Sequence, residues 1–381
     1  MGKIGILTFH YSNNYGGVLQ ALSLQKAIEL MGFEVEIINF VPSYYNTSIK
    51  NSLGISKKTL FVKKNFNLIN LCKKYFIARK YNHRITQKFN EFRMKEMRLS
   101  KQVDENSILT ILNNYDLIIA GSDQIWNPSQ RKNREYFLDF GSYYTGKKVS
   151  YAADSTIKEV NKEDIEKLRR NLLDFDYISV RNEYSSDFVY NIIGRKVDIV
   201  TDPTINYNYQ PNIDCIDNED YILVYTLGKE IEGSNLVALK KVKDVYGNLP
   251  IYSIIIPTIN FELPNYADKI FYDLDPNEWL IMIKKAKFFY TDSFHGVLYA
   301  LKYNIPFLAY YTEKMRSTRF IDLSKRYNIE KYIVQNTEEI DLKNSIKSKP
   351  DFESINNLLN IHKQYSLAKF EEILKNLLGK N

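Results

Sequence analysis

Three residues that could take part in catalysis follow a short apolar segment in the second half of the chain. Ser293, His295 and Gly296 come directly after residues 287–291, whose aromatic composition is typical of a strand buried on both faces. Apolar residues from Val297 onward predict a short helix. A strand, a polar turn and a helix form the connection at which open α/β sheets bind ligands. A histidine there can exchange protons near neutral pH, and the helix start can bind an anion. The alternative is a capped helix whose histidine only bonds a carbonyl.

A second polar cluster follows the expected strand at 117–120 and its Gly121. Packing does not require this combination of side chains, so we expect a ligand site, although a hydrogen-bonded turn that braces the domain is the alternative. The cluster consists of Ser122, Asp123, Gln124, Trp126 and Asn127.

Two further candidates follow other expected strands. Asn14, Gly16 and Gly17 precede a helix expected at 18–31, where they could hold a ligand or simply form a tight turn. The loop has no GxGxxG spacing, so a nicotinamide or flavin site is not indicated. Arg181 ends a strand and could hold a carboxylate or phosphate with two hydrogen bonds. An ion pair with Glu183 is the alternative for this arginine.

Strands and helices alternate along the chain, and this pattern predicts an α/β protein with two Rossmann-like domains facing a cleft. We expect the first domain at 1–208, with a basic helical insertion at about 43–101, and the second at 209–340. A helical tail at 341–381 is expected to pack back on the first domain. The expected strands are 3–9, 35–40, 117–120, 147–153, 176–181, 197–201, 221–227, 250–256, 287–291 and 305–311.

The composition is that of a globular protein of 381 residues, 44% hydrophobic and 25% charged. Cys72 and Cys215 lie far apart and show no metal-ligand spacing, which argues against a disulfide framework. No signal peptide fits the first residues, and no apolar run approaches the ~20 residues of a membrane span. We therefore expect a cytoplasmic protein.

The positive charge is concentrated in one segment. Residues 50–101 hold fifteen Lys or Arg against Glu91 and Glu96, whereas the whole chain has a net charge of +7. Aromatic residues among these lysines could form a surface that contacts the inner face of a membrane. The favoured alternative to membrane contact is a helical insertion that packs on its own domain. Nucleic-acid binding is not expected, since no recognised motif accompanies the charge.

Five short segments together resemble the polysaccharide pyruvyl transferase family. They are Asn-Tyr-Gly-Gly-Val-Leu-Gln (14–20), Ala-Gly-Ser-Asp-Gln-Ile-Trp-Asn (120–127), Ile-Ser-Val-Arg (178–181), Thr-Asp-Pro-Thr (201–204) and Thr-Asp-Ser-Phe-His-Gly (291–296). The resemblance implies a glycosyltransferase-B-like fold, with phosphoenolpyruvate as donor and a pair of sugar hydroxyls as acceptor. The product would be a pyruvate ketal on a glycan or its lipid-linked precursor, in capsule, exopolysaccharide or cell-envelope synthesis.

The resemblance also suggests roles for particular residues. His295 matches the family's active-site histidine, and Arg181 matches an arginine that holds the donor. From the chemistry of ketal formation we further expect His295 to be the principal acid/base, Asp123 to orient or deprotonate an acceptor hydroxyl, and Trp126 to stack on the sugar. No cofactor and no metal are expected. The expected substrate-binding set is Asn14, Gly16, Gly17, Gln20, Ser122, Gln124, Trp126, Asn127, Ser293, Gly296, Arg316 and Arg319.

The chain departs from the family at one point, because several relatives have Arg-Leu-His where it has Ser293-Phe294-His295. Arg316, Arg319 or Lys229 could supply the missing cation. Two other functions stay open. A glycosyltransferase would bind a nucleotide sugar, for which Asp273, Asp275 or Glu278 could contact the ribose and diphosphate. A catalytically silent member would only bind glycan.

Overall fold

The computed structural model describes residues 2–45, 52–53, 68–127, 134–155, 162–211, 219–259, 261–312, 314–338 and 342–379. Side chains at 68, 134, 162–164 and 314–316 lie outside the description. The expected insertion (43–101) and linker (205–219) are therefore described only in part.

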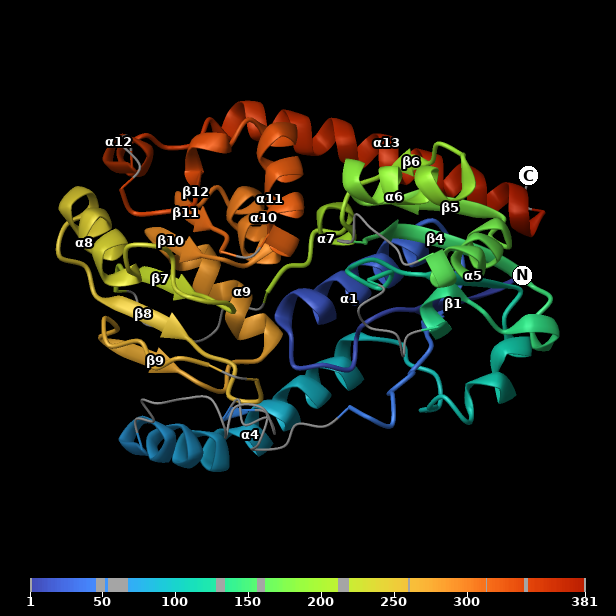
Figure 1. The fold of residues 1–381 in the computed structure, drawn as a ribbon, viewed down its shortest axis with the longest axis horizontal. Helices are drawn as coiled ribbons and strands as arrows, with labels where there is room; N and C mark the ends of the chain where they lie inside the picture. The colour runs from blue at the N-terminus through green and yellow to red at the C-terminus, as the bar shows by residue number, and fades with distance from the viewer. Residues whose placement is uncertain are drawn as a thin grey trace.

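The first half of the chain forms a six-stranded parallel sheet in the order β2-β1-β3-β4-β5-β6 (Figure 1). Its central strands are apolar and buried on both faces, as a sheet covered by helices on both sides requires. The strands are β1 (Lys3–Leu7), β2 (Glu34–Ile37), β3 (Leu117–Ala120), β4 (Lys147–Ala153), β5 (Tyr177–Val180) and β6 (Asp198–Ile199). The helices are α1 (Tyr15–Leu30), α5 (Lys162–Leu173), α6 (Glu183–Ile193) and α7 (Pro203–Asn206). Short 3₁₀ helices occupy Ile108–Thr110, Leu112–Asn114, Arg134–Phe137 and Gly141–Tyr143.

The second half repeats the design with the order β12-β11-β10-β7-β8-β9, again all parallel. The predicted architecture of two Rossmann-like halves is thus confirmed. Its strands are β7 (Ile222–Tyr225), β8 (Ile251–Ile254), β9 (Lys269–Phe271), β10 (Phe288–Thr291), β11 (Phe307–Tyr310) and β12 (Ile333–Val334). Its helices are α8 (Asn235–Tyr246), α9 (Pro276–Lys285), α10 (Phe294–Lys302), α11 (Lys314–Tyr327) and α12 (Leu342–Lys347), with a 3₁₀ helix at Glu330–Tyr332.

A helix of 29 residues, α4 (Leu68–Glu96), extends from the first half along the second (Figure 1). Phe89 and Phe92 on its apolar face are buried in the core. Three of its cations pair with acidic groups of the second half: Lys74 with Glu262 at 3.3 Å, Arg84 with Asp273 at 3.2 Å and Lys88 with Glu278 at 2.9 Å. Part of the basic charge therefore bridges the two halves.

The last helix, α13 (Phe352–Leu378), follows the second half in the chain but passes over both halves in Figure 1. Its Phe370 ring lies 4.4 Å from the ring of Tyr151 in β4. The Ser366 hydroxyl accepts a hydrogen bond from the Thr201 backbone nitrogen at 2.9 Å. Both contacts anchor the C-terminal helix on the first sheet.

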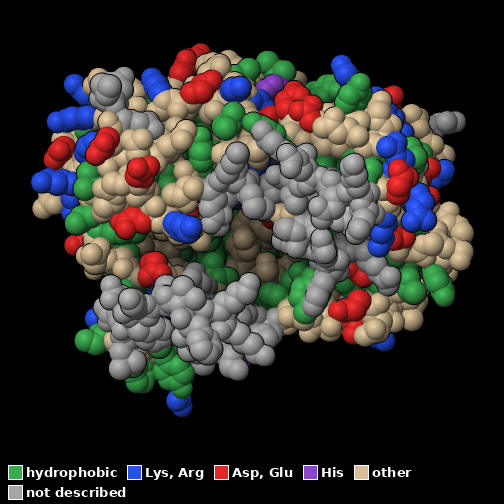
Figure 2. All heavy atoms as spheres, in the orientation of Figure 1, with side chains coloured by type: hydrophobic (Ala, Val, Ile, Leu, Met, Phe, Trp, Pro, Cys, Tyr) green, Lys and Arg blue, Asp and Glu red, His purple; other side chains and the backbone are tan. Residues whose placement is uncertain are grey.

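The described surface mixes charges of both signs (Figure 2). None of the described helices combines the length and the apolar composition that crossing a bilayer demands.

Candidate functional site

The site is built around the connection between β10 and α10. The Ser293 side chain accepts a hydrogen bond from the Gly296 backbone nitrogen at 3.1 Å and so caps α10. The Thr291 hydroxyl bonds the carbonyl of Tyr225 at 2.6 Å, which ties the strand end to β7. This bonding fixes His295 in the first turn of α10, at the positive end of the helix dipole.

His295 lies at the contact between the two halves and is only 6% exposed. Its Nε2 atom lies 3.4 Å from a carboxylate oxygen of Asp202, which belongs to the first half. The other side of the ring rests on Gly16, where an added β-carbon would overlap Nδ1. The imidazole is therefore held between α1 and the start of α7.

Asp202 belongs to a buried network of charges. Its carboxylate caps α7 by accepting from the backbone and side chain of Thr204 at 3.0 and 2.7 Å. It also accepts a hydrogen bond from Arg181 at 2.8 Å, and Ser122 donates to it at 3.4 Å. Arg181 binds Asp154 as well. The guanidinium thus already satisfies two carboxylates of the protein itself.

The network sets the charge of its members. Burial alone would raise the pKa of Asp202, but His295 and Arg181 outweigh it and hold that pKa well below its usual range. Burial likewise acts to raise the pKa of Asp154, and Arg181 and Arg319 lower it overall. Asp202 is therefore an ionised carboxylate that can orient the imidazole of His295.

Asp123 extends the network toward the solvent. Its backbone has a φ of 74°, a strained conformation for a residue other than glycine. One of its carboxylate oxygens lies 3.6 Å from Arg181 and 3.8 Å from Arg319. The side chain keeps 16% exposure, so it can reach a ligand.

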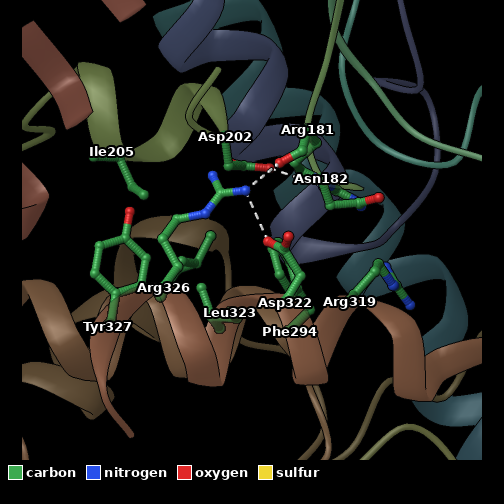
Figure 3. A pocket seen from close by; sticks show the side chains of 11 residues that line it. Arg181, Asn182, Asp202, Ile205, Phe294, Arg319, Asp322, Leu323, Arg326 and Tyr327 are labelled. Atoms are coloured by element: carbon green, nitrogen blue, oxygen red, sulfur yellow. Dashed lines mark hydrogen bonds and ion pairs between the residues drawn. The ribbon is translucent and has the colours of Figure 1, made fainter. Parts of the chain in front are cut away.

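Two more arginines, both from α11, lie beside this network (Figure 3). Arg319 and Arg181 approach the Phe294 ring, with their guanidinium carbons 5.6 and 4.6 Å from its centre. Arg326 donates to the Arg181 carbonyl at 3.1 Å and to Asp322 at 2.8 Å. The cavity among these residues measures about 10 Å³, room for about one water molecule.

Other residues of the first half that the sequence predicted for the site make hydrogen bonds within the protein itself. Asn14 caps α1 by accepting from the Gly17 nitrogen at 3.1 Å. Gln20 is fully buried and donates to Thr8 at 2.9 Å. Gln124 is half-buried, and its backbone carbonyl accepts a hydrogen bond from the backbone nitrogen of the buried Asn127 at 3.3 Å. These residues shape the loops around the site.

One predicted role is wrong for this structure. Trp126 is fully buried, its ring stacks on Phe137 at 5.6 Å and its indole nitrogen donates to the Tyr136 carbonyl. Its ring therefore has no free face for a sugar. Gly296 packs closely on Thr291, 2.9 Å from an added β-carbon, rather than facing open space. The side chain of Arg316 lies outside the described residues.

Sequence reasoning missed Asp154, Asp202 and Arg326 as members of the site. Asp154 directly follows β4, and Asp202 stands in the quoted Thr-Asp-Pro-Thr segment, so their positions at strand ends were available as signals. Arg326 lies in the last turn of α11, and nothing in its sequence context points to the site.

The fold resembles that of solved glycosyltransferase-B-like structures. Two solved structures share the fold: Arabidopsis thaliana UGT89C1, with 10% identity, a TM-score of 0.54 and 99% of both chains covered, and Anabaena Alr3699/HepE in complex with UDP and glucose, with 8% identity, a TM-score of 0.54 and 100% of both chains covered. Such low identity supports a glycosyltransferase-B-like fold and nothing finer. None of the curated proteins matches the chain.

The sequence match is more specific than the structural one. The model of a family described as polysaccharide pyruvyl transferase matches residues 14–314, from the cap of α1 to the start of α11. This range includes His295, Asp202, Arg181 and Asp123. The chain belongs to the polysaccharide pyruvyl transferase family.

Proposed function

We propose that this protein transfers pyruvate from phosphoenolpyruvate to two hydroxyls of a sugar, forming a ketal and releasing phosphate. The observation that carries the proposal is the pairing of His295 with ionised Asp202 beside three arginines, at the junction of the two halves. A proton donor next to guanidinium groups suits a donor with a carboxylate and a phosphate.

The reaction consists of two additions. A proton moves from His295 to the methylene carbon of phosphoenolpyruvate, and a first sugar hydroxyl adds to the neighbouring carbon. The bond from that carbon to the phosphate oxygen then breaks, and phosphate leaves with its electron pair. A second hydroxyl adds and closes the ring. One hydroxyl proton restores the proton that His295 gave to the new methyl group, and the other ends on phosphate, so the transfer needs no oxidant or reductant.

In this proposal the three arginines have different roles. Arg181 is committed to Asp154 and Asp202 and keeps the network assembled. Arg319 and Arg326 contact the donor, and Arg319 supplies the cation that Ser293 lacks. Asp123, which lies between Arg181 and Arg319, receives an acceptor hydroxyl.

The donor enters only when the two halves or α11 move, because about 10 Å³ cannot hold phosphoenolpyruvate. The contact that must open includes the stack of Tyr15 on Trp279, with ring centres 5.1 Å apart, and the bond from the Tyr15 hydroxyl to the Leu274 carbonyl at 2.9 Å. Closure afterwards would exclude water from the cationic intermediate.

The acceptor in this proposal is a glycan or a lipid-linked saccharide in capsule, exopolysaccharide or cell-envelope synthesis. A lipid-linked acceptor would bring the protein to the inner face of a membrane. The exposed end of α4 supports this contact, since it presents Ile69 and Phe76 among lysines.

Thermal unfolding with phosphoenolpyruvate, run beside UDP-glucose, tests the donor. We expect a rise in melting temperature with phosphoenolpyruvate only, and a much smaller rise in Arg319→Gln. Arg169→Gln, which removes a surface arginine of α5, is the matched control and should respond like the wild type. A rise with UDP-glucose only would replace the proposal with a nucleotide-sugar glycosyltransferase. No response to either would favour a silent glycan-binding protein.

A further inference from the structure

A larger pocket opens at the carboxyl ends of β7 and β8, and we call it the strand-end pocket. Its volume is about 720 Å³, which lies within the usual range for pockets that bind small molecules. It is lined by residues 226–230, 234–236, 253, 255–256, 259 and 261–266. Of the residues that the sequence suggested for the site, only Lys229 lines it, as one of three possible replacements for the missing cation.

The lining of the strand-end pocket combines apolar and polar groups. The apolar residues include Ile255, Ile256 and Phe261, together with Ile259, which is 40% exposed. The polar residues include Ser253, Asn235 and Tyr266. Ser253 and Asn235 are 3% and 6% exposed, so their polar atoms sit deep in the wall. A sugar ring, apolar on its faces and polar at its edge, matches this arrangement.

The charges of the strand-end pocket argue against a phosphate. Its lining contains Lys229, Glu230 and Glu262, one cation against two anions. The Glu230 carboxylate accepts a hydrogen bond from the backbone nitrogen of Asn235 at 2.7 Å, and Glu262 forms an ion pair with Lys74 of α4. No cluster of arginines among the described lining residues could hold a diphosphate. The ligand that fits best is uncharged.

The pocket is joined to the catalytic turn by Asp292. Its two carboxylate oxygens accept from the backbone nitrogens of Leu227 and Gly228, each at 2.6 Å. Leu227 and Gly228 line the strand-end pocket, and Asp292 precedes His295 by three residues. A chain bound in the pocket thus lies next to the turn that carries the proton donor.

We propose that the strand-end pocket binds an uncharged saccharide segment of the acceptor, adjacent to the residues to be modified. The inference rests on the proposed function for its link to catalysis, but binding itself does not depend on the reaction. Phosphoenolpyruvate occupies the arginine-lined centre, so donor and acceptor have separate sites.

Saturation-transfer NMR tests this binding directly on the full-length protein. The probe is the neutral oligosaccharide pool released by mild acid from the envelope of the cells that make the protein, with UDP as a charged probe. Ile259→Trp fills the mouth of the pocket. Val237→Trp is the matched control, because Val237 is 43% exposed on α8 but does not line the pocket.

We expect the neutral pool to bind the wild type and Val237→Trp, with the signal at least tenfold weaker in Ile259→Trp. No binding to the wild type, undiminished binding to Ile259→Trp, or displacement of the sugars by UDP would each overturn the inference. The melting-temperature response to phosphoenolpyruvate should be the same in all three proteins. If that response is absent while sugar binding follows the expected pattern, the proposed reaction fails and the saccharide pocket stands.

Discussion

The imidazole of His295 rests on the α-carbon of Gly16, with the β-carbon of His295 2.8 Å from where a β-carbon at position 16 would be. Gly16 belongs to α1 of the first half, and His295 belongs to α10 of the second. The absence of a side chain at position 16 therefore sets how closely the halves meet at the reacting histidine.

Gly16→Ala should separate the two halves at this point. The added methyl group overlaps the ring, so we expect a loss of about 1–3 kcal/mol in the free energy of unfolding and a large loss of activity. Gly17→Ala, in the same helix, is the control, because its β-carbon would lie 3.4 Å or more from its nearest neighbours, Phe9 and Asn14. That variant should be as stable as the wild type or more so. Equal behaviour of the two variants in urea unfolding would contradict the close contact.

Arg181→Met should destabilise the protein far more than Arg319→Gln. Removing Arg181 leaves Asp154 and Asp202 buried without their shared cation, at a cost of about 3–5 kcal/mol. Arg319 lies 3.8 Å from Asp123, whose side chain is 16% exposed, whereas Asp154 and Asp202 are 1% and 2% exposed, so the loss of Arg319 should cost less. Guanidinium unfolding of both variants measures this difference. A mild effect of Arg181→Met would mean that the arginine is not the structural centre of the network.

Lys302 should make stability depend on pH in the alkaline range. Its ammonium group donates to the carbonyls of Thr204 and Tyr207, and burial together with Lys363 lowers its pKa to about 7. Between pH 7 and about 10 the unfolded chain binds a proton at this lysine that the folded chain has lost, so stability rises with pH.

The comparison with Lys302→Met isolates this contribution, since other titrating groups are common to both proteins. The difference in free energy of unfolding between wild type and variant should change by about 2 kcal/mol from pH 7 to pH 9, in favour of the wild type. A constant difference over this range would show that the lysine keeps its ordinary pKa.

The proposed membrane contact predicts salt-sensitive binding to phosphatidylserine vesicles. Ile69 and Phe76 are 69% and 67% exposed and seven residues apart, so they share one face of α4. Ile69→Ser/Phe76→Ser should lose most of the binding, whereas Leu30→Ser, at an equally exposed position on α1, should keep it. Co-sedimentation in 50 and 500 mM salt measures both effects. Binding that is equal in all variants, or absent in the wild type, would rule the contact out.

The sequence was sufficient to predict the long elements, whereas several of the short ones were missed. Apolar runs such as Leu117–Ala120 and Phe288–Thr291 predicted their strands because burial on both faces leaves a clear pattern. β9, β12 and α12 have three, two and six residues, too few for any periodicity to show.

Most of the site residues that the sequence predicted follow strands, and Arg319 on α11 is the exception. His295, Arg181 and Asp123 stand at such positions and meet in one network. Trp126 stands there too, yet its ring turns into the core, because sequence position does not fix side-chain direction. The ion pairs between α4 and the second half could not be predicted from the sequence either, since residues such as Arg84 and Asp273 meet only in the tertiary fold.

The most direct test of the proposed function is release of phosphate from phosphoenolpyruvate by the purified protein, with and without envelope glycan from the cells that make it. We predict release that depends on the glycan, a matching gain of one pyruvate ketal in the glycan's mass spectrum, and loss of both in His295→Gln. Glycan-independent release, or none from a folded wild type that responds to a nucleotide sugar instead, would contradict the assignment of phosphoenolpyruvate as donor.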